Sequence, residues 1–257
     1  MSDARAQERI QALARRLQHP DPSQLWFQLA EIAGEQIYLR HGIEVGEDDV
    51  VLDVGANVGV AAAFFAVQCG ARVVHSFEPV RPVCELLRKN VSGLPACVVH
   101  EQGLSRASGE SAITYYPGAA AMSGLYADPQ RDRALVRAVL ANLGVPADEA
   151  DARLANAFEP LTLRCELRTL SSFLREEALA RVDLLKIDVE RAELDVLAGI
   201  DEADWPVIAQ VVVEVHDEGG RLDAISGTLV DRGFRVAHEQ DPAMRGTDVQ
   251  LVYATRP

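Results

Sequence analysis

The stretch VVLDVGANVGVAAAFFAVQCG, from Val50 to Gly70, decides how the rest of the chain is interpreted. Residues 49–54 form a largely apolar run that ends at Gly55, which is typical of a strand buried on both faces. The apolar segment after Gly59 reads as a helix that ends at Gly70. A glycine-rich turn between a strand and its helix presents backbone N–H groups at the carboxyl edge of a sheet. The pattern therefore predicts a ligand held against the backbone of this turn.

The alternation of strand and helix recurs along the chain. Further strands are expected at 71–78, 96–103, 181–188, 207–217, 235–239 and 248–255, and helices at 60–70, 81–93, 192–200 and 221–234. Successive strand–helix–strand units imply parallel strands with right-handed crossovers. We predict an α/β, Rossmann-like fold with a seven-stranded, mostly parallel sheet and helices on both faces.

Two segments depart from this rhythm. Residues 1–45 are expected to form an N-terminal helical cap, with helices at 5–18 and 23–40. Residues 46–257 are expected to form the main domain. Within that domain, the irregular stretch 105–180 lies between the third and fourth strands and is interpreted as a lid or substrate insertion, because insertions of this length are usually functional.

Composition limits the class of protein. The chain of 257 residues has 25 basic and 39 acidic residues, a net charge of −14, which argues against a nucleic-acid surface. No apolar run reaches the ~20 residues of a membrane span, and the N-terminus lacks the apolar core of a secretory signal. The four cysteines show no C-x-x-C spacing. We expect a cytoplasmic protein that binds neither nucleic acid nor membrane.

Two ligands commonly occupy such a turn, a dinucleotide and S-adenosylmethionine. The dinucleotide fingerprint G-x-G-x-x-G is absent, which argues against an NAD-linked oxidoreductase, the alternative enzyme class. The chain has G-A-N-V-G instead, and Glu78 follows at the end of the second strand, where a carboxylate can accept both ribose hydroxyls. The cofactor-binding candidates are Asp53, Gly55, Ala56, Asn57, Gly59 and Glu78, with Gln102 and Gly103 near the adenine and Asp188 near the methyl group.

Four segments of the chain resemble the FkbM family of S-adenosylmethionine-dependent methyltransferases. They are LDVGANVGVAAAFFA, SFEPV, LLKIDVERAELDVLAGI and VVEVHDEGGRLDAISGTLVDRGF. The resemblance covers about residue 48 to the C-terminus. It implies a class I methyltransferase fold with S-adenosylmethionine as cofactor, and O-methylation of hydroxyls on polyketides, sugars or related metabolites. Arg191 departs from the family, which usually has glycine there.

The segment YYPGAAAMSGLYADPQRDRALV is similar to family members that act within or beside polyketide and nonribosomal peptide synthases. This likeness implies a substrate carried on an acyl carrier protein. A landing site for an acidic carrier could be formed by Arg133 and Arg137, spaced i and i+4. The alternatives are a free small molecule or sugar as acceptor, and a non-enzymatic docking module that has lost activity.

Methyl transfer to an alcohol needs a base. His216 is the candidate, because it ends a strand at the ligand-binding edge and an ordinary histidine pKa suits neutral pH. Glu190 is the favoured partner that orients the imidazole, with Asp188 close to the methyl group or hydroxyl and Lys186 neutralising Asp188. Glu214 is the alternative partner.

The remaining candidates concern metals and the acceptor. Asp188, Glu214 and His216 are the types of ligand that suit Mg²⁺ or Mn²⁺, but the Asp-Asn pair of catechol-type methyltransferases is missing after the fifth strand, so no metal is expected. Four residues of the insertion are candidates for the acceptor pocket: Tyr115, Tyr116, Met122 and Tyr126.

Overall fold

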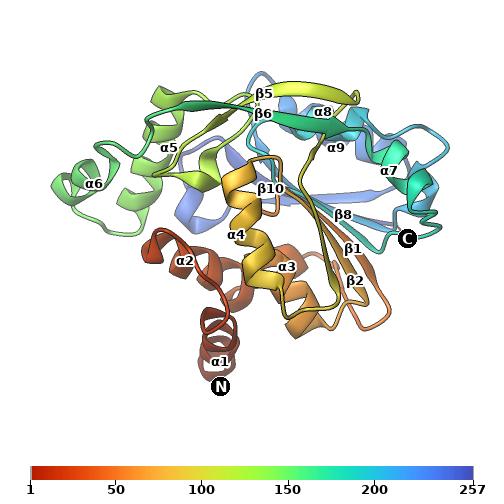
Figure 1. Ribbon diagram of the computed structural model, residues 1–257, viewed down its shortest axis with the longest axis horizontal. Coiled ribbons are helices and arrows are strands. Elements are labelled where there is room, and N and C mark those ends of the chain that lie inside the picture. The colour runs from red at the N-terminus through yellow and green to blue at the C-terminus, as the bar shows by residue number, and fades with distance from the viewer. Residues whose placement is uncertain (1, 257) are drawn as a thin grey trace.

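A seven-stranded sheet dominates the computed structural model, which describes residues 2–256 (Figure 1). Its strands are β1 (Val50–Val54), β2 (Val73–Phe77), β3 (Cys97–His100), β7 (Leu184–Ile187), β8 (Gln210–His216), β9 (Arg235–Glu239) and β10 (Val249–Thr255). They follow the order β3-β2-β1-β7-β8-β10-β9. β10 is antiparallel to both of its neighbours, and the other pairs are parallel. The predicted α/β class and mostly parallel sheet are confirmed.

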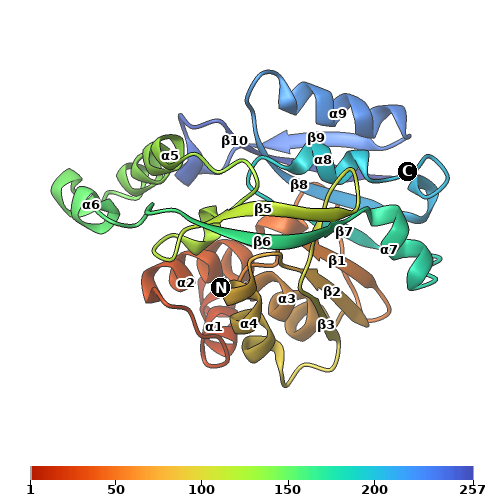
Figure 2. The ribbon, with the colours of Figure 1, turned by 45° about the horizontal axis from the view of Figure 1, so that its top comes forward.

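Helices cover both faces of this sheet, as predicted (Figure 2). One face carries α3 (Val60–Phe64), its π-helical continuation η3 (Phe65–Cys69) and α4 (Arg81–Val91), and the other carries α7 (Leu170–Glu176), α8 (Glu193–Ala198) and α9 (Arg221–Asp231). Successive side chains of a strand point to opposite faces, so Val51 belongs to one hydrophobic core and Leu52 to the other. Both faces of β1 are therefore buried.

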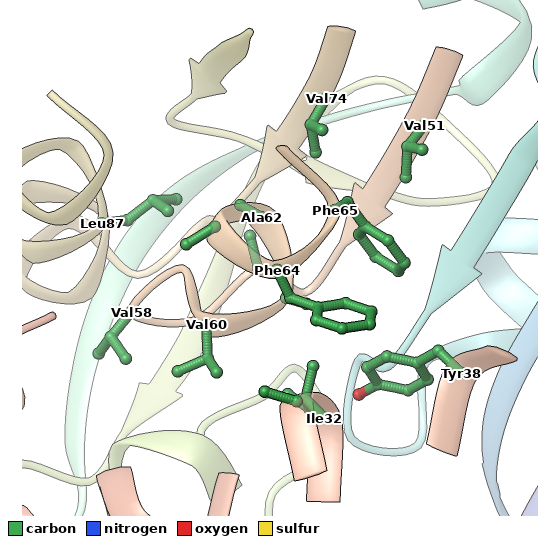
Figure 3. Close-up of a cluster of buried hydrophobic side chains, with 14 of the residues drawn as sticks. Ile32, Tyr38, Val51, Val58, Val60, Ala62, Phe64, Phe65, Val74 and Leu87 are labelled. Atoms are coloured by element: carbon green, nitrogen blue, oxygen red, sulfur yellow. The ribbon is translucent and has the colours of Figure 1, made fainter. Parts of the chain in front are cut away.

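The N-terminal segment packs on the α3 face. It consists of α1 (Ser2–Ala14), α2 (Pro22–Leu29), the π-helical turn η1 (Ala30–Gly34) and the 3₁₀ turn η2 (Ile37–Leu39). The continuous helix predicted for 23–40 is wrong, because the chain leaves helical geometry at Gln36, where φ is 53°. This break places Tyr38 beside Ile32 and the aromatic rings of Phe64 and Phe65, where α3 continues into η3 (Figure 3).

The insertion forms a small sheet of its own. Its strands are β4 (Gly103–Leu104), β5 (Gly109–Tyr115) and β6 (Leu161–Arg168), and η4 (Ala120–Met122), α5 (Pro129–Asn142) and α6 (Ala147–Leu154) lie between the last two. The third strand was predicted to reach residue 103, but it ends at His100, and Gly103 pairs with β6 instead. The tips of α5 and α6 extend beyond the main sheet (Figure 2).

α7 was not predicted. Leu170, Phe173 and Leu174 pack into the core under the sheet, so the last part of the stretch 105–180 belongs structurally to the main core. The remaining elements are two short 3₁₀ turns, η5 (Trp205–Val207) before β8 and η6 (Pro242–Met244) before β10. Among residues 2–256, no helix has both the length and the apolar composition that crossing a bilayer requires.

Candidate active site

The turn after β1 has two positions that do not accommodate a side chain. Gly55 has a φ of 78°, and a Cβ placed there would lie 1.7 Å from the carbonyl oxygen of Asp188. At Gly59, where φ is 92°, a Cβ would lie 2.6 Å from Cδ1 of Leu87. Because L side chains avoid this conformation, glycine is required at both positions. Gly55, Ala56 and Asn57 of this turn line a cavity above it.

Glu78 fixes the shape of this turn. Its Oε2 accepts a hydrogen bond from the backbone N–H of Asn57 (3.0 Å), and its Oε1 accepts one from Val80 (2.8 Å). Burial is the main reason why the pKa of Glu78 is raised to about 7; the two N–H donors oppose the shift. Each carboxylate oxygen keeps acceptor capacity for a further donor, such as a ribose hydroxyl.

A buried ion pair lies below the turn. The parallel register places Asp53 opposite Lys186, and Nζ of Lys186 is 3.0 Å from Oδ1 of Asp53. The same ammonium donates to the carbonyl oxygen of Gly55 (2.8 Å) and lies 3.5 Å from Asp188. Burial alone would lower the pKa of Lys186, but Asp53 and Asp188 outweigh burial and raise it. Lys186 therefore neutralises Asp188, as expected from sequence, and Asp53 as well.

A first cavity lies directly above the turn. Of the residues predicted to bind the cofactor, six line it: Gly55, Ala56, Asn57, Glu78, Gly103 and Asp188. Three do not: Asp53 is fully buried beneath the turn, Gly59 faces α4, and Gln102 lies outside the wall. The N-terminal segment closes the cavity with side chains that have no sequence motif, among them Tyr38, whose hydroxyl donates to Oδ2 of Asp188 (3.1 Å).

A second cavity adjoins the first. Its wall is mainly apolar and comes from α5, α6 and the segment that follows them, with Leu135, Val136, Val139, Leu140, Leu154 and Phe158. Seven residues line both cavities: Phe27, Gln28, Ala121, Met122, Glu190, Glu214 and Met244. The shared wall shows that the two cavities meet beside Glu190 and Glu214.

His216 lines the second cavity from the end of β8. The imidazole is almost fully buried, with Nε2 3.1 Å from Oε2 of Glu190 and Nδ1 3.3 Å from Oε1 of Glu193. Burial alone would lower the pKa of His216, but Glu190 and Glu193 outweigh burial and raise the pKa to about 11. The ordinary pKa assumed from sequence therefore does not apply, because two carboxylates flank the ring.

Glu190 is the predicted neighbour of His216, whereas Glu193 was not singled out. Glu190 has a left-handed backbone, with a φ of 52°, in the turn between β7 and α8. A Cβ on Gly124 of the insertion would lie 3.1 Å from Cβ of Glu190, so the insertion covers this turn closely. The sequence feature that could have identified Glu193 is its position in the KIDVERAE block, three residues after Glu190.

Two further carboxylates face the cavities without partners. Glu31 and Glu214 make no side-chain hydrogen bond or ion pair with any residue in the range 2–256. Burial is the largest cause of the pKa of each being raised well above the ordinary value, and nearby acids, including Asp188, add to it. The first cavity therefore holds two acidic groups that have no counterpart among residues 2–256, and one of them, Glu214, lies at the junction with the second cavity.

The three tyrosines proposed for the acceptor pocket lie outside both cavities. Tyr116 is fully buried and donates to Oδ2 of Asp132 (2.9 Å), and the hydroxyl of Tyr126 donates to Asp195 (2.6 Å). Tyr115 packs against the core on the α3 face. Of the four insertion candidates, only Met122 faces the cavities.

Strand order, the antiparallel β10 and the glycine turn together define the class I, Rossmann-like methyltransferase fold. Residues 53–236 match the family model described as the methyltransferase FkbM domain, and the chain belongs to this family of methyltransferases. The crystal structure of methyltransferase FkbM from Methylobacillus flagellatus KT shows a similar fold. It has a TM-score of 0.51 and 16% identity, covering 97% of this chain and 59% of that one.

Two curated relatives are similar over most of this chain. The 31-O-demethyl-FK506 methyltransferase FkbM of Streptomyces tacrolimicus is 39% identical over 242 residues, which are 93% of this chain and 92% of that protein. The AMB antimetabolite synthetase AmbE of Pseudomonas aeruginosa is 40% identical over 241 residues, which are 88% of this chain. The chain spans only 11% of that synthetase.

Proposed function

We propose that the chain is an S-adenosylmethionine-dependent O-methyltransferase whose acceptor enters through the second cavity. The observation that carries this proposal is the junction of the two cavities at Glu190 and Glu214. One cavity rests on the glycine turn and the other is apolar, so a donor and an acceptor could meet there. Proximity and orientation of two reactants can supply a large part of a rate enhancement.

The residues of the first cavity fit the cofactor. Gly55 and the backbone of Asn57 would form the floor, Glu78 would accept the ribose hydroxyls, and Gly103 would lie beside the adenine. The cofactor would supply an electrophilic methyl group bound to a cationic sulfur. Glu31, an acid of the first cavity without a protein partner among residues 2–256, would favour that positive charge.

Glu190, Glu214 and His216 would handle the proton of the acceptor hydroxyl. His216 is held as an imidazolium between two carboxylates, so it orients Glu190 through the contact at Nε2. The carboxylate of Glu190, which is paired with that imidazolium, is then the group able to accept the proton, and Glu214 lies beside it at the junction. Asp188 is held by Tyr38 and Lys186 on the donor side of the junction.

The acceptor is proposed to be a hydroxyl on a polyketide-type molecule or on an intermediate bound to a carrier protein. The apolar wall of the second cavity supports an acceptor with an apolar body. The names of the two relatives, a methyltransferase of demethyl-FK506 and an antimetabolite synthetase, support a biosynthetic acceptor. A free small molecule or sugar is the second candidate.

Mass spectrometry tests this function. The chain is incubated with S-adenosylmethionine and either hydroxyacyl carrier proteins or free alcohols, and each acceptor is examined for the gain of one methyl group. His216→Ala should abolish turnover while leaving cofactor affinity within a few-fold. His238→Ala, at an exposed position of β9, should leave turnover unchanged. Cofactor binding without transfer to any acceptor would favour a docking module instead.

A further inference from the structure

We infer that Glu190, Glu214 and His216 form a binding site for one divalent cation. One ligand atom from each residue can be chosen so that all three lie within 4.8 Å of one another. They come from two neighbouring strand ends, because Glu190 follows β7 and the other two belong to β8. From the sequence no metal was expected, and the ligand set weighed there contained Asp188 together with Glu214 and His216. In the structure Tyr38 and Lys186 hold Asp188, and Glu190 replaces it in the set.

The spacing within the set suits an octahedral cation. Ligand atoms about 2.1 Å from Mg²⁺ and at right angles to each other are about 3 Å apart. Oε2 of Glu190 and Nε2 of His216 are 3.1 Å apart. A cation could therefore join these two atoms with little movement of either side chain, and it would take the place of the proton that they share.

Unsatisfied carboxylate oxygens point to the same ligand. Glu190 is only 7% exposed, and its Oε2 has no hydrogen-bond partner despite lying beside His216. Glu214 makes no side-chain hydrogen bond or ion pair within the described chain. Buried carboxylates are normally paired or bound to a metal. Glu190 meets only the imidazole of His216, which Glu193 also contacts, and Glu214 meets no cation among residues 2–256, so the set can accept a further positive charge.

Glu193 supplies the outer contact that metal-binding histidines usually have. Its Oε1 lies 3.3 Å from Nδ1 of His216, on the side of the ring away from Glu190. A carboxylate at Nδ1 fixes the tautomer that leaves Nε2 free to bind a cation. Arg221, 3.7 Å from Oε2 of Glu193, holds that carboxylate in turn. Glu193 is thus a positioning residue in this proposal.

The two carboxylates suit Mn²⁺ or Mg²⁺, and the single imidazole also accepts Mn²⁺ or a later transition metal, so Mn²⁺ serves as the probe ion. Three protein ligands leave about three positions of an octahedral shell open. Glu190 and Glu214 line both cavities, so these positions would face the acceptor. If the proposed function holds, the acceptor is a molecule that offers both the reactive hydroxyl and a neighbouring oxygen to the same cation.

Binding of Mn²⁺ alone tests the site without any methyl transfer. The full chain is freed of metal with EDTA, and free Mn²⁺ is followed by electron paramagnetic resonance during titration. We expect one Mn²⁺ per chain, with an affinity that Glu214→Gln weakens by about tenfold or more and that Glu193→Gln weakens by a smaller factor. Glu214 is only partly buried and has no partner, so its variant should fold; thermal melting checks this.

Glu31→Gln is the matched control. Glu31 is another unpartnered carboxylate of the first cavity, but it lies outside the clustered set. Its variant should bind Mn²⁺ within about threefold of the unchanged chain. Absence of stoichiometric Mn²⁺ binding, or equal losses in Glu31→Gln and Glu214→Gln, would overturn the site. Mn²⁺ binding in a chain that methylates no acceptor would leave the site standing and reject the proposed function.

Discussion

Gly55 and the carbonyl oxygen of Asp188 are in such close contact that a single methyl group cannot fit between them. A Cβ on Gly55 would lie 1.7 Å from that oxygen. The contact joins the first turn of the fold to the end of β7, so it sets the distance between the floor of the first cavity and the acidic groups beside it. A change at Gly55 should therefore disturb both.

Gly55→Ala should destabilise the protein by about 3 kcal/mol or more, because overpacking against backbone adds to the strain of a left-handed alanine. Gly42→Ala is the matched control, since Gly42 has a φ of 88° with nothing within 4 Å of its Cβ. That variant should lose only about 1–2 kcal/mol. Chemical denaturation measures both, and comparable losses would contradict the packing argument.

Cofactor affinity should rise with pH around neutrality. The pKa of Glu78 is raised to about 7, so this side chain is mainly protonated at pH 6 and mainly ionised at pH 8. Because ribose hydroxyls would donate to the ionised form, affinity should increase by up to about tenfold across that range. Calorimetry with S-adenosylhomocysteine at both pH values measures it. Glu78→Gln should show no such pH dependence; an equal slope in the variant would assign the effect to another group.

Lys186→Met should be strongly destabilising. It would leave Asp53, which has no exposed surface, without its cation at 3.0 Å. Breaking a buried pair from one side costs about 3–5 kcal/mol, whereas removing both charges costs less. Urea unfolding should therefore show a large loss of stability in Lys186→Met and a partial recovery in Asp53→Asn/Lys186→Met. A single variant as stable as the double variant would argue against the pair.

The main sheet and the glycine turn could be predicted from sequence because their signals are local. Apolar runs of strand length and a glycine at a left-handed position are visible within a few residues, as at Val50–Val54 and Gly55. The pairing of Gly103 with Leu167 could not be predicted, because it joins segments more than 60 residues apart. The short strand β4 carries too little pattern to indicate its partner.

The candidate site was predictable only in its residue types. His216 and Glu190 could be placed at the same sheet edge from their positions at strand ends. The raised pKa of His216 could not be predicted, because it needs Glu190 and, in addition, Glu193, which reaches the second ring nitrogen from α8. Likewise, Tyr38 comes near Asp188 only because the N-terminal segment breaks at Gln36 and folds back over the cavity.

Arg191, at a position where the resemblance implied glycine, has a structural partner in the insertion. Its Nη1 lies 2.6 Å from Oδ1 of Asp132 on α5, and both side chains are buried. The backbone of Arg191 is left-handed, with a φ of 74°. The ion pair therefore compensates for a conformation that glycine would adopt without strain, and it ties α5 to the turn that carries Glu190.

Arg191→Gly should relieve about 1 kcal/mol of backbone strain but lose about 3–5 kcal/mol from the broken buried pair, so a net loss of about 2–4 kcal/mol is expected. Because α5 lines the second cavity, KM for the acceptor should rise while cofactor affinity stays within a few-fold. Arg191→Gly/Asp132→Asn should regain part of the stability, since Tyr116 can still donate to residue 132. Urea unfolding and steady-state kinetics measure these effects. Unchanged stability and KM in Arg191→Gly would show that the arginine is merely tolerated, and that α5 is held by its other contacts.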